Sequence, residues 1–395
     1  MASIMLITGF FLIALYLIAL AGMATGFHKL QRRVAAPASP LPDAALPSVA
    51  IIISARNEQD NLPGLLRALN RLDYPGEKLE ICIIDDRSQD RSREILRRAQ
   101  AENPRLTVLH IDDLIPDTAP KKRAISMGIA ATRGEIILLT DADCTPPPTW
   151  VRAMAAHYRD HRTVMVPGYS SYRFDRPAPA LIRGMLALEY FTHSALAAAS
   201  TPLHHPITAC GCNLSYRRST WEQVGGFGEL NQWISGDDDL FVHKVAQRYP
   251  GRFSYAFSAE ARVPQAAPKT FRQFWNQRIR YASKSRQYQP GLIAGLVAVY
   301  FVNVFVFLGS LSFMLSPQLA AGAGIAWLLK AGGEWLFLRR VTRACGEEHL
   351  LRWFLPAQLV HPLYVIVFGC LGLFARFQWK EDNYEKKTKP ELTYS

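Results

Sequence analysis

The 395-residue sequence lacks two features that would assign it to a well-known class: a cysteine framework and a glycine-rich nucleotide-binding loop. Its six cysteines are scattered, and the only close pair, Cys210 and Cys212, has no second half, so neither a disulfide scaffold nor a zinc site is expected. Neither Gly-x-Gly-x-x-Gly nor a Walker-type sequence occurs, which excludes the phosphate-binding loops of dinucleotide-binding and P-loop enzymes.

Charge is scarce at both ends of the chain, although the chain as a whole carries a net charge of +12. Residues 1–27 contain no Lys, Arg, Asp or Glu, and residues 4–23 are long enough to cross a bilayer. Because no basic residue precedes this run and Lys29, Arg32 and Arg33 follow it, we predict an uncleaved anchor followed by a cytoplasmic segment. A purely soluble enzyme is therefore excluded.

Three further apolar segments lie near the C-terminus, at about residues 291–315, 319–338 and 355–374. Lys330 and Glu334 stand four residues apart in the second segment and are expected to pair. Four crossings would place the C-terminus outside, whereas a basic tail favours the cytoplasm. Either one C-terminal segment is re-entrant or interfacial, or the basic tail lies outside. The basic residues of the tail are Arg376, Lys380, Lys386, Lys387 and Lys389.

The middle of the chain alternates apolar runs with segments of helical periodicity. Such alternation predicts an α/β fold, with a mostly parallel sheet covered by helices and ligands bound at the carboxyl ends of its strands. A later segment, residues 177–199, is expected to be a helix that is either buried or lies on the membrane surface. The expected strands are residues 48–54, 79–84, 106–111 and 135–140, and the expected helices are residues 58–72, 88–101 and about 121–131.

Two groups of aspartates are candidates for chemistry. Asp141 and Asp143 follow an apolar strand and could hold Mg²⁺ or Mn²⁺ together with phosphate oxygens, or could cap the next helix. Residues 237–239 are three successive aspartates, which repel one another. They could supply a general base that deprotonates an acceptor hydroxyl, or could cap the helix expected at residues 240–248.

A basic, aromatic segment at residues 271–286 precedes the C-terminal apolar segments. Its cations could attract anionic lipid, or could bind a diphosphate and a ring. Nucleic-acid binding is not expected, because much of the positive charge borders membrane segments and no nucleic-acid-binding motif occurs.

Taken together, these clusters resemble the family 2 glycosyltransferases, in particular the membrane-anchored branch that includes ceramide glucosyltransferases and polysaccharide synthases. The similarity covers roughly residues 48–281 and rests on six motifs in the family's order. They are Ile53-Ser-Ala-Arg-Asn-Glu58, Ile84-Asp-Asp-Arg-Ser-Gln-Asp90, Lys121-Lys-Arg-Ala124 with Gly128, Asp141-Ala-Asp143, the segment from Gly211 and Asn213 to Phe227 followed by Gly236-Asp237-Asp238, and Gln277-x-x-Arg280-Tyr281.

The resemblance implies a GT-A-like fold and a role for each matched residue. Asp143 with Asp141 would bind Mg²⁺ or Mn²⁺, and Asp238 would be the catalytic base, with Asp237 as base in an alternative register. The implied substrate-binding residues are Ala55, Arg56, Glu58, Asp86, Lys121, Asp141, Gly211, Asn213, Gln277, Arg280 and Tyr281.

The same resemblance implies an inverting transferase in the bacterial inner membrane, with its catalytic domain in the cytoplasm. It would move a sugar from a nucleotide-sugar, most simply a UDP-sugar, to a membrane lipid or lipid-linked acceptor. A processive polysaccharide synthase and a non-catalytic membrane scaffold are the alternatives. The tail residues Trp379, Lys380 and Tyr384 are similar to a family tail motif, although Glu381 and Asp382 depart from it.

The implied organisation has five parts. An N-terminal anchor (1–27) and a linker (28–47) precede a cytoplasmic GT-A domain (48–286), a C-terminal membrane domain (287–376) and a polar tail (377–395).

Overall fold

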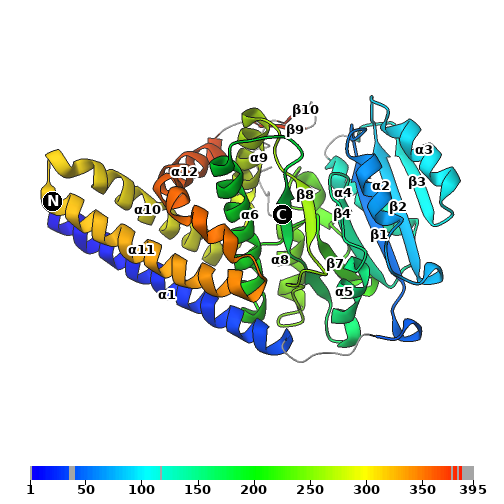
Figure 1. Cartoon of the computed structure of the whole chain (residues 1–395), viewed down its shortest axis with the longest axis horizontal. Coiled ribbons are helices and arrows are strands. Elements are labelled where there is room, and N and C mark those ends of the chain that lie inside the picture. Colours follow the sequence, from blue (N-terminus) through cyan, green and yellow to red (C-terminus); the bar gives the residue numbers. More distant parts are fainter. Residues whose placement is uncertain (1, 35–40, 116–117, 375–376, 380–381, 385–395) are drawn as a thin grey trace, which may run out of the picture.

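The protein, described here by a computed structural model, is elongated, with a bundle of long helices at one end and an α/β unit at the other (Figure 1). The structure describes residues 2–34, 41–115, 118–374, 377–379 and 382–384. The predicted tail motif therefore falls partly outside the described residues.

A six-stranded sheet forms the centre of the α/β unit, in the order β3-β2-β1-β4-β7-β5. The first four strands in this order are parallel, whereas β7 runs antiparallel to both β4 and β5. All four predicted strands are confirmed, and a mostly parallel sheet results. The strands are β1 (Val49–Ala55), β2 (Leu79–Asp86), β3 (Leu106–Ile111), β4 (Ile136–Asp141), β5 (Met165–Pro167) and β7 (Leu214–Arg217).

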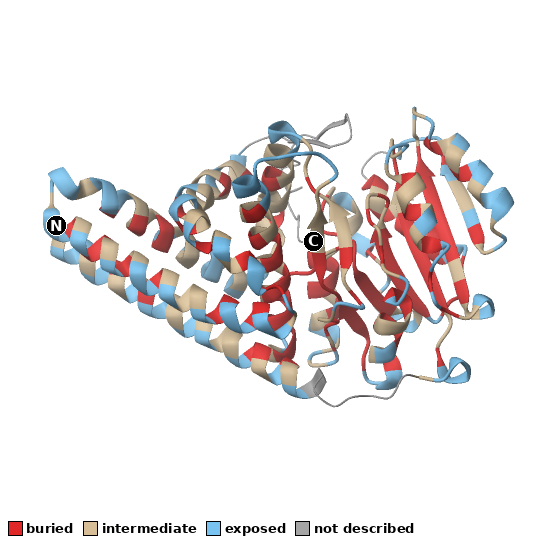
Figure 2. Cartoon of the chain, in the orientation of Figure 1, coloured by how far each residue is buried: buried red, intermediate tan, exposed pale blue. Residues whose placement is uncertain are grey.

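Helices cover both faces of this sheet, which explains why β1 and β4 read as continuous apolar runs. On one face α2 (Leu62–Leu69) packs Leu62, Leu65 and Leu69 against the strands, at helical spacing. The buried strands appear as the red centre of the α/β unit in Figure 2. The other covering helices are α3 (Ser92–Glu102) and α5 (Trp150–Ala156) on that face, and α4 (Pro120–Ala130) and α8 (Asp239–Arg248) on the opposite face.

Shorter elements connect the sheet to the helical bundle. Two strands, β6 (Ser170–Arg173) and β8 (Val263–Ala266), form a small parallel pair. The remaining elements before the bundle are η1 (Asp43–Ala45), η2 (Gly76–Lys78), η3 (His157–Arg159), η4 (Thr201–Leu203), α7 (Arg218–Gln223), η5 (Gly228–Gln232), α9 (Phe271–Ser283) and η6 (Lys284–Gln287).

Helix α6 (Ala180–Ser200) corresponds to the segment predicted to be either buried or on the membrane surface. Leu188, Phe191 and most residues after them are buried between the α/β unit and the bundle, whereas Leu181 and Ile182 at its start are about half exposed. Burial is thus correct for most of the helix, and surface exposure is confined to its first turn.

Long apolar helices occur near both ends of the described chain, but of the three segments predicted near the C-terminus the second, residues 319–338, is not among those long and apolar enough to cross a membrane. Three helical segments of the described chain are long and apolar enough to cross a membrane: Ala2–Arg32, Pro290–Met314 and Glu348–Phe374. The predicted pair inside α11 is confirmed, with Lys330 Nζ 2.9 Å from Glu334 Oε1. The helices are α1 (Ala2–Val34), α10 (Pro290–Leu311), η7 (Ser312–Met314), α11 (Pro317–Ala344), η8 (Glu348–Trp353) and α12 (Phe354–Phe374), and the hairpin β9 (Phe377–Trp379) and β10 (Asp382–Tyr384) follows them.

Candidate active site

The carboxyl ends of β1, β2 and β4 meet at one edge of the sheet. Ser54 pairs with Asp141 across β1 and β4, and Ala55 pairs with Asp85 across β1 and β2. The strand register therefore brings three of the predicted polar clusters to a single edge, where ligands of parallel sheets bind.

The loops after β1 and β2 are joined by hydrogen bonds between side chains and backbone. Asn57 N donates to Ser88 Oγ at 3.0 Å, and Gln89 N donates back to Asn57 Oδ1 at 2.8 Å. Glu58 N donates to Ser92 Oγ at 2.8 Å. The two loops therefore form one unit at the sheet edge.

Asp86 lies at the end of β2 and is almost completely buried. Arg87 donates to both of its carboxylate oxygens, through Nε at 2.7 Å and Nη2 at 3.2 Å. The backbone of Arg87 has a positive φ of 54°. The carboxylate of Asp86, one of the predicted substrate-binding residues, is thus covered by an arginine. Ala55, the last residue of β1, and Arg56, which follows it, are also buried.

Lys121, at the start of α4, joins two acidic clusters that are about a hundred residues apart in sequence. Its Nζ lies 2.9 Å from Asp141 Oδ1 and 2.8 Å from Asp237 Oδ2. Burial alone would lower the pKa of Lys121, but the two carboxylates outweigh burial and raise this pKa well above its usual value. The Asp141-Ala-Asp143 segment and the Asp237–Asp239 segment therefore belong to one site.

Lys122 fixes the loop that precedes Asp237, a role that sequence reasoning missed. Its buried Nζ donates to the backbone carbonyl oxygens of Leu230 and Ser235, at 2.8 and 2.9 Å. Burial lowers the pKa of Lys122 to about 8, although nearby aspartates oppose the shift. Nζ also donates to a third carbonyl oxygen, that of Trp233. All three partners are more than a hundred residues away in the sequence, so no local sequence pattern reveals them.

Asp238 differs from its two neighbours in exposure and in its partners. Its side chain is 19% exposed, against 7% for Asp237 and 2% for Asp239. In the described part of the chain, both of its hydrogen bonds fall on Oδ1, from Asp239 N at 2.7 Å and Lys284 Nζ at 3.1 Å. The predicted capping role is thus confirmed, and Oδ2 faces Gly211.

Two glycines allow the backbone around these aspartates to fold closely. Gly236 has a φ of +90°, a conformation that other residues rarely adopt, and it turns the chain into Asp237. A Cβ on Gly211 would stand 3.3 Å from Asp237 Oδ2 and 3.4 Å from Asp238 Cβ. The loop around Gly211 therefore lies directly against both carboxylates.

Asp239 is buried and is bound by residues that lead into α10. Its Oδ2 is 2.7 Å from Lys284 Nζ and accepts a hydrogen bond from Tyr288 Oη at 2.6 Å. Burial would raise the pKa of Asp239, but Lys284 outweighs burial and lowers this pKa to about 2. Lys284 thus ties two successive aspartates to the segment directly before a membrane-length helix.

Asp143 supplies the second carboxylate of the predicted metal site. Its oxygens accept long hydrogen bonds from Gln265 Nε2, at 3.3 and 3.4 Å. Within the described ranges, no group of three or more His, Cys, Asp and Glu could hold a metal ion. Two aspartates still fit Mg²⁺ or Mn²⁺, because such ions are commonly held by one or two carboxylates together with substrate phosphates and water.

The predicted motif lies on α9, which packs against α12 and reaches α6 through the side chain of Arg278. Arg278 is buried and pairs with Glu189 of α6, while its Nη1 donates to Gln277 Oε1 at 2.9 Å. The guanidinium of Arg280 lies 5.1 Å from the centroid of the Tyr281 ring, and Lys284 Nζ lies 5.6 Å from it. Three cations therefore surround Tyr281, since Arg278 is also 5.7 Å away.

Comparison with known sequences identifies the α/β unit. Residues 50–224 match the family described as Glycosyl transferase family 2. The chain carries a family 2 glycosyltransferase domain. The resemblance inferred from the motifs is thereby confirmed.

The similarity to curated relatives covers only part of the length of each relative. The probable glycosyltransferase YdaM of Bacillus subtilis is 28% identical over 252 residues, which are 62% of this chain and 56% of that protein. The beta-monoglucosyldiacylglycerol synthase of a Synechocystis species is 30% identical over 112 residues, 28% of this chain and 23% of that protein. The chain thus spans about half of the first relative and less of the second.

A solved structure shares the fold. The mannosyltransferase PcManGT from Pyrobaculum calidifontis, in complex with GDP-Man and Mn2+, is 20% identical and has a TM-score of 0.50. The similarity covers 89% of this chain and 99% of that chain. The predicted GT-A-like fold is confirmed.

Asn213, one of the predicted substrate-binding residues, lies in the core of the family 2 domain. Its side chain is fully buried, accepts a hydrogen bond from Trp150 Nε1 at 3.0 Å, and donates to the carbonyl oxygens of Tyr169 and Ala261, both at 2.8 Å. These bonds occupy the amide within the core, next to the loop around Gly211.

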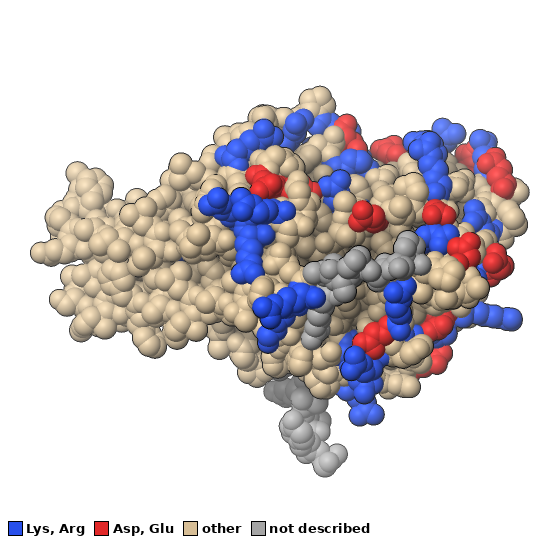
Figure 3. Space-filling model, turned by 60° about the horizontal axis from the view of Figure 1, so that its bottom comes forward, with Lys and Arg blue, Asp and Glu red and all other residues tan. Residues whose placement is uncertain are grey.

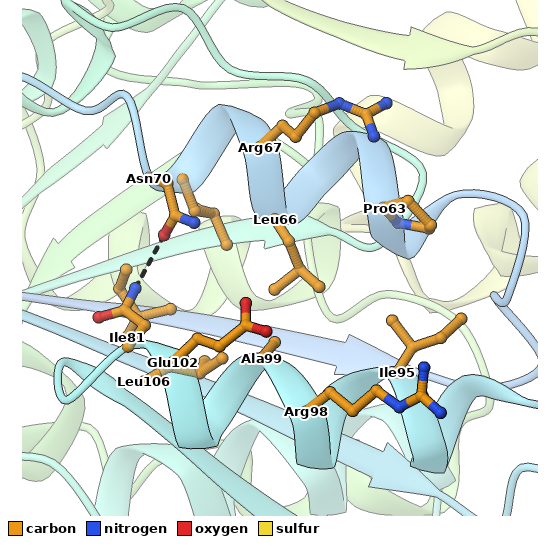
Figure 4. Close-up of a pocket in the computed structure, with 12 residues that line it drawn as sticks. Pro63, Leu66, Arg67, Asn70, Ile81, Ile95, Arg98, Ala99, Glu102 and Leu106 are labelled. Carbon is orange, nitrogen blue, oxygen red and sulfur yellow. Dashed lines mark hydrogen bonds between the residues drawn. The ribbon is translucent and has the colours of Figure 1, made fainter.

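One hollow in the family 2 domain lies away from the strand ends. It measures about 340 Å³ and lies between α2 and α3, with Leu66 of α2 facing Ile95 and Ala99 of α3 (Figure 4). Asn103 Nδ2 donates to Asn70 Oδ1 at 2.9 Å across one end. None of the predicted site residues lines this hollow, so we place the candidate site at the strand ends.

Proposed function

We propose that the protein is an inverting glycosyltransferase that moves a sugar from a nucleotide-sugar, with UDP as the expected nucleotide, to a membrane lipid or lipid-linked acceptor. The double ion pair of Lys121 with Asp141 and Asp237 carries this proposal. It supports a single site in which a donor held at the end of β4 lies beside the carboxylates at the start of α8.

On the donor side, the interlocked loops after β1 and β2 would bind the nucleoside, and Asp141 and Asp143 would hold Mg²⁺ or Mn²⁺. When bound, the ion would neutralise charge on the diphosphate leaving group. Lys121 forms an ion pair with Asp141 and would bring a second positive charge to the same diphosphate.

On the acceptor side, Asp238 is the residue best suited to act as a general base. Asp237 forms an ion pair with Lys121, and Asp239 forms one with Lys284. In the described part of the chain, both hydrogen bonds of Asp238 fall on Oδ1, and its Oδ2 carries none. In the proposed reaction Asp238 takes the proton of an acceptor hydroxyl, whose oxygen attacks the anomeric carbon opposite the leaving diphosphate and inverts it.

A lipid acceptor is supported by the position of this base beside the bundle. Lys284 and Tyr288, which hold Asp238 and Asp239, directly precede α10. On the face shown in Figure 3, Lys and Arg gather where the bundle joins the α/β unit, while the bundle itself shows almost no charge. We place this junction at the cytoplasmic surface of the membrane, following the positive-inside rule.

The test is to incubate the purified full chain in native lipid with a panel of nucleotide-sugars and Mg²⁺ or Mn²⁺. We expect one donor to release its nucleotide and to yield a lipid carrying one sugar. Asp143→Asn should abolish release, whereas the matched surface variant Asp60→Asn should not. A polymer ladder would support a polysaccharide synthase instead, and no release from any donor would contradict the proposed activity.

A further inference from the structure

Helix α12 follows a different path from the other long helices. Helices α1, α10 and α11 lie side by side and extend away from the α/β unit (Figure 1). At their far end, Met314 and Leu315 in the turn between α10 and α11 are 83% and 92% exposed. These three helices therefore run from the α/β unit to a distant apolar tip.

Both ends of α12 lie near the α/β unit. At its start, the ring of Phe354 packs 5.2 Å from that of Trp335, in the cluster that also holds Phe191 of α6. Near its end, Phe368 packs 5.0 Å from Trp275 of α9. Gly372 lies so close to Ala282 of α9 that a Cβ on it would come within 2.4 Å of the alanine Cβ.

The depth that α12 reaches in the bundle can be estimated from its partners. At 1.5 Å per residue, Trp327 lies about 25 Å along α11 from its end at Ala344, and Tyr300 lies about 15 Å along α10 from Pro290. Trp327 contacts Gln358, and Tyr300 contacts Cys370. Helix α12 thus reaches about the middle of the bundle. It then turns back toward the α/β unit without reaching the tip.

A proline within α12 allows this return. Pro362 has no backbone N–H, so the carbonyl oxygen of Gln358 loses its partner within the helix, and Trp327 Nε1 donates to it at 3.5 Å instead. Lys330 Nζ lies 3.3 Å from both Gln358 Oε1 and His361 Nδ1. Glu334 also accepts from Gln358, so a polar cluster anchors this part of α12 to α11.

We propose that α12 is a re-entrant helix, which enters and leaves the bilayer on the side of the α/β unit. Its apolar outer face contacts the acyl chains of the adjacent leaflet, through Leu355, Leu359 and Leu363, which are 44–68% exposed. Helix α12 packs against α10, on which Leu296, Val297 and Phe301 are also exposed. The basic tail then lies on the same side as the family 2 domain, which satisfies the positive-inside rule.

The test is to label single cysteines in sealed inverted and right-side-out membrane vesicles with a membrane-impermeant maleimide. The full chain carries Cys370→Ser, because Cys370 is exposed, and that variant alone measures background. Glu348→Cys reports the residues before α12, and Ser395→Cys reports those after it. Glu102→Cys in the family 2 domain and Met314→Cys at the tip are the two controls.

We expect Glu348→Cys and Ser395→Cys to react in the same vesicles as Glu102→Cys, and Met314→Cys to react only in the opposite ones. Reaction of Ser395→Cys together with Met314→Cys would overturn the proposal, because α12 would then cross. Reaction of Met314→Cys together with Glu102→Cys would also overturn it, because the bundle would not span the bilayer. The readout needs no transferase activity, so it stands or fails separately from the proposed function.

Discussion

The donor side and the acceptor side of the candidate site are each held in place by a different kind of interaction. On the donor side, the loops after β1 and β2 are joined by neutral hydrogen bonds such as Asn57 N to Ser88 Oγ. On the acceptor side, Asp238 and Asp239 are held by the buried cation of Lys284. The first set is confined to the α/β unit, whereas the second comes from the segment that leads into the membrane bundle.

This difference implies that the two sides respond differently to mutation. A neutral hydrogen bond contributes on the order of 1 kcal/mol, whereas breaking a buried ion pair by removing one partner costs about 3–5 kcal/mol. The hydrogen bonds between the loops after β1 and β2 should therefore tolerate single changes, whereas the acceptor side should depend on a few charged residues.

Lys284→Met should have the largest effect. It leaves the buried carboxylate of Asp239 without its cation, so we expect about 3–5 kcal/mol of destabilisation and a strong loss of transfer. Thermal unfolding in detergent and a transfer assay measure the two effects. Lys284→Arg should recover part of both, and an unchanged melting temperature in Lys284→Met would show that the pair contributes little.

Lys121→Met should come next, because it leaves Asp141 and Asp237 facing each other without a cation. We expect transfer to fall about 10²–10³-fold, the usual effect of removing one group that stabilises transition-state charge. The control is Arg67→Met, on an exposed face of α2, which should keep full activity. Equal activity in both variants would remove Lys121 from the site.

Acid should weaken the acceptor side over a defined range of pH. The pKa of Asp239 is about 2 in the folded protein and near 3.8 when unfolded, because Lys284 outweighs the effect of burial. Its contribution, about 2 kcal/mol, is therefore complete above pH 4 and is lost as the pH falls from 4 to 2. Melting temperatures over this range should fall less steeply in Asp239→Asn than in the natural protein.

Ser88→Ala should have the smallest effect. It removes the acceptor of one backbone hydrogen bond between the donor loops, so we expect about 1 kcal/mol of lost stability. The KM for the donor should rise a few-fold while kcat stays nearly constant. A large fall in kcat would show that the donor loops are less self-contained than the comparison of the two sides suggests.

The parts that sequence reasoning predicted correctly are those with local signals. Strands buried on both faces read as apolar runs, and helical spacing marks residues such as Leu62, Leu65 and Leu69. Short strands were missed, because β5 and β7 have only three and four residues and no distinctive pattern. The order of the motifs was sufficient to recognise the family.

The parts that sequence reasoning missed depend on contacts between distant segments. Lys122 donates to carbonyl oxygens more than a hundred residues away, and Lys284 meets Asp238 across 46 positions. Asn213 was expected to touch substrate, but its burial is a property of the assembled core. The path of α12 likewise depends on its packing against α9, which hydropathy does not encode.

The most direct test of the proposed site is to measure donor binding and transfer separately in Asp238→Asn. If Asp238 is the general base beside the metal-held donor, the variant should bind the nucleotide-sugar with unchanged affinity, while transfer falls roughly 10²–10⁴-fold. Transfer at the natural rate, with binding intact, would contradict the assignment of Asp238 and with it the proposed arrangement of donor and acceptor.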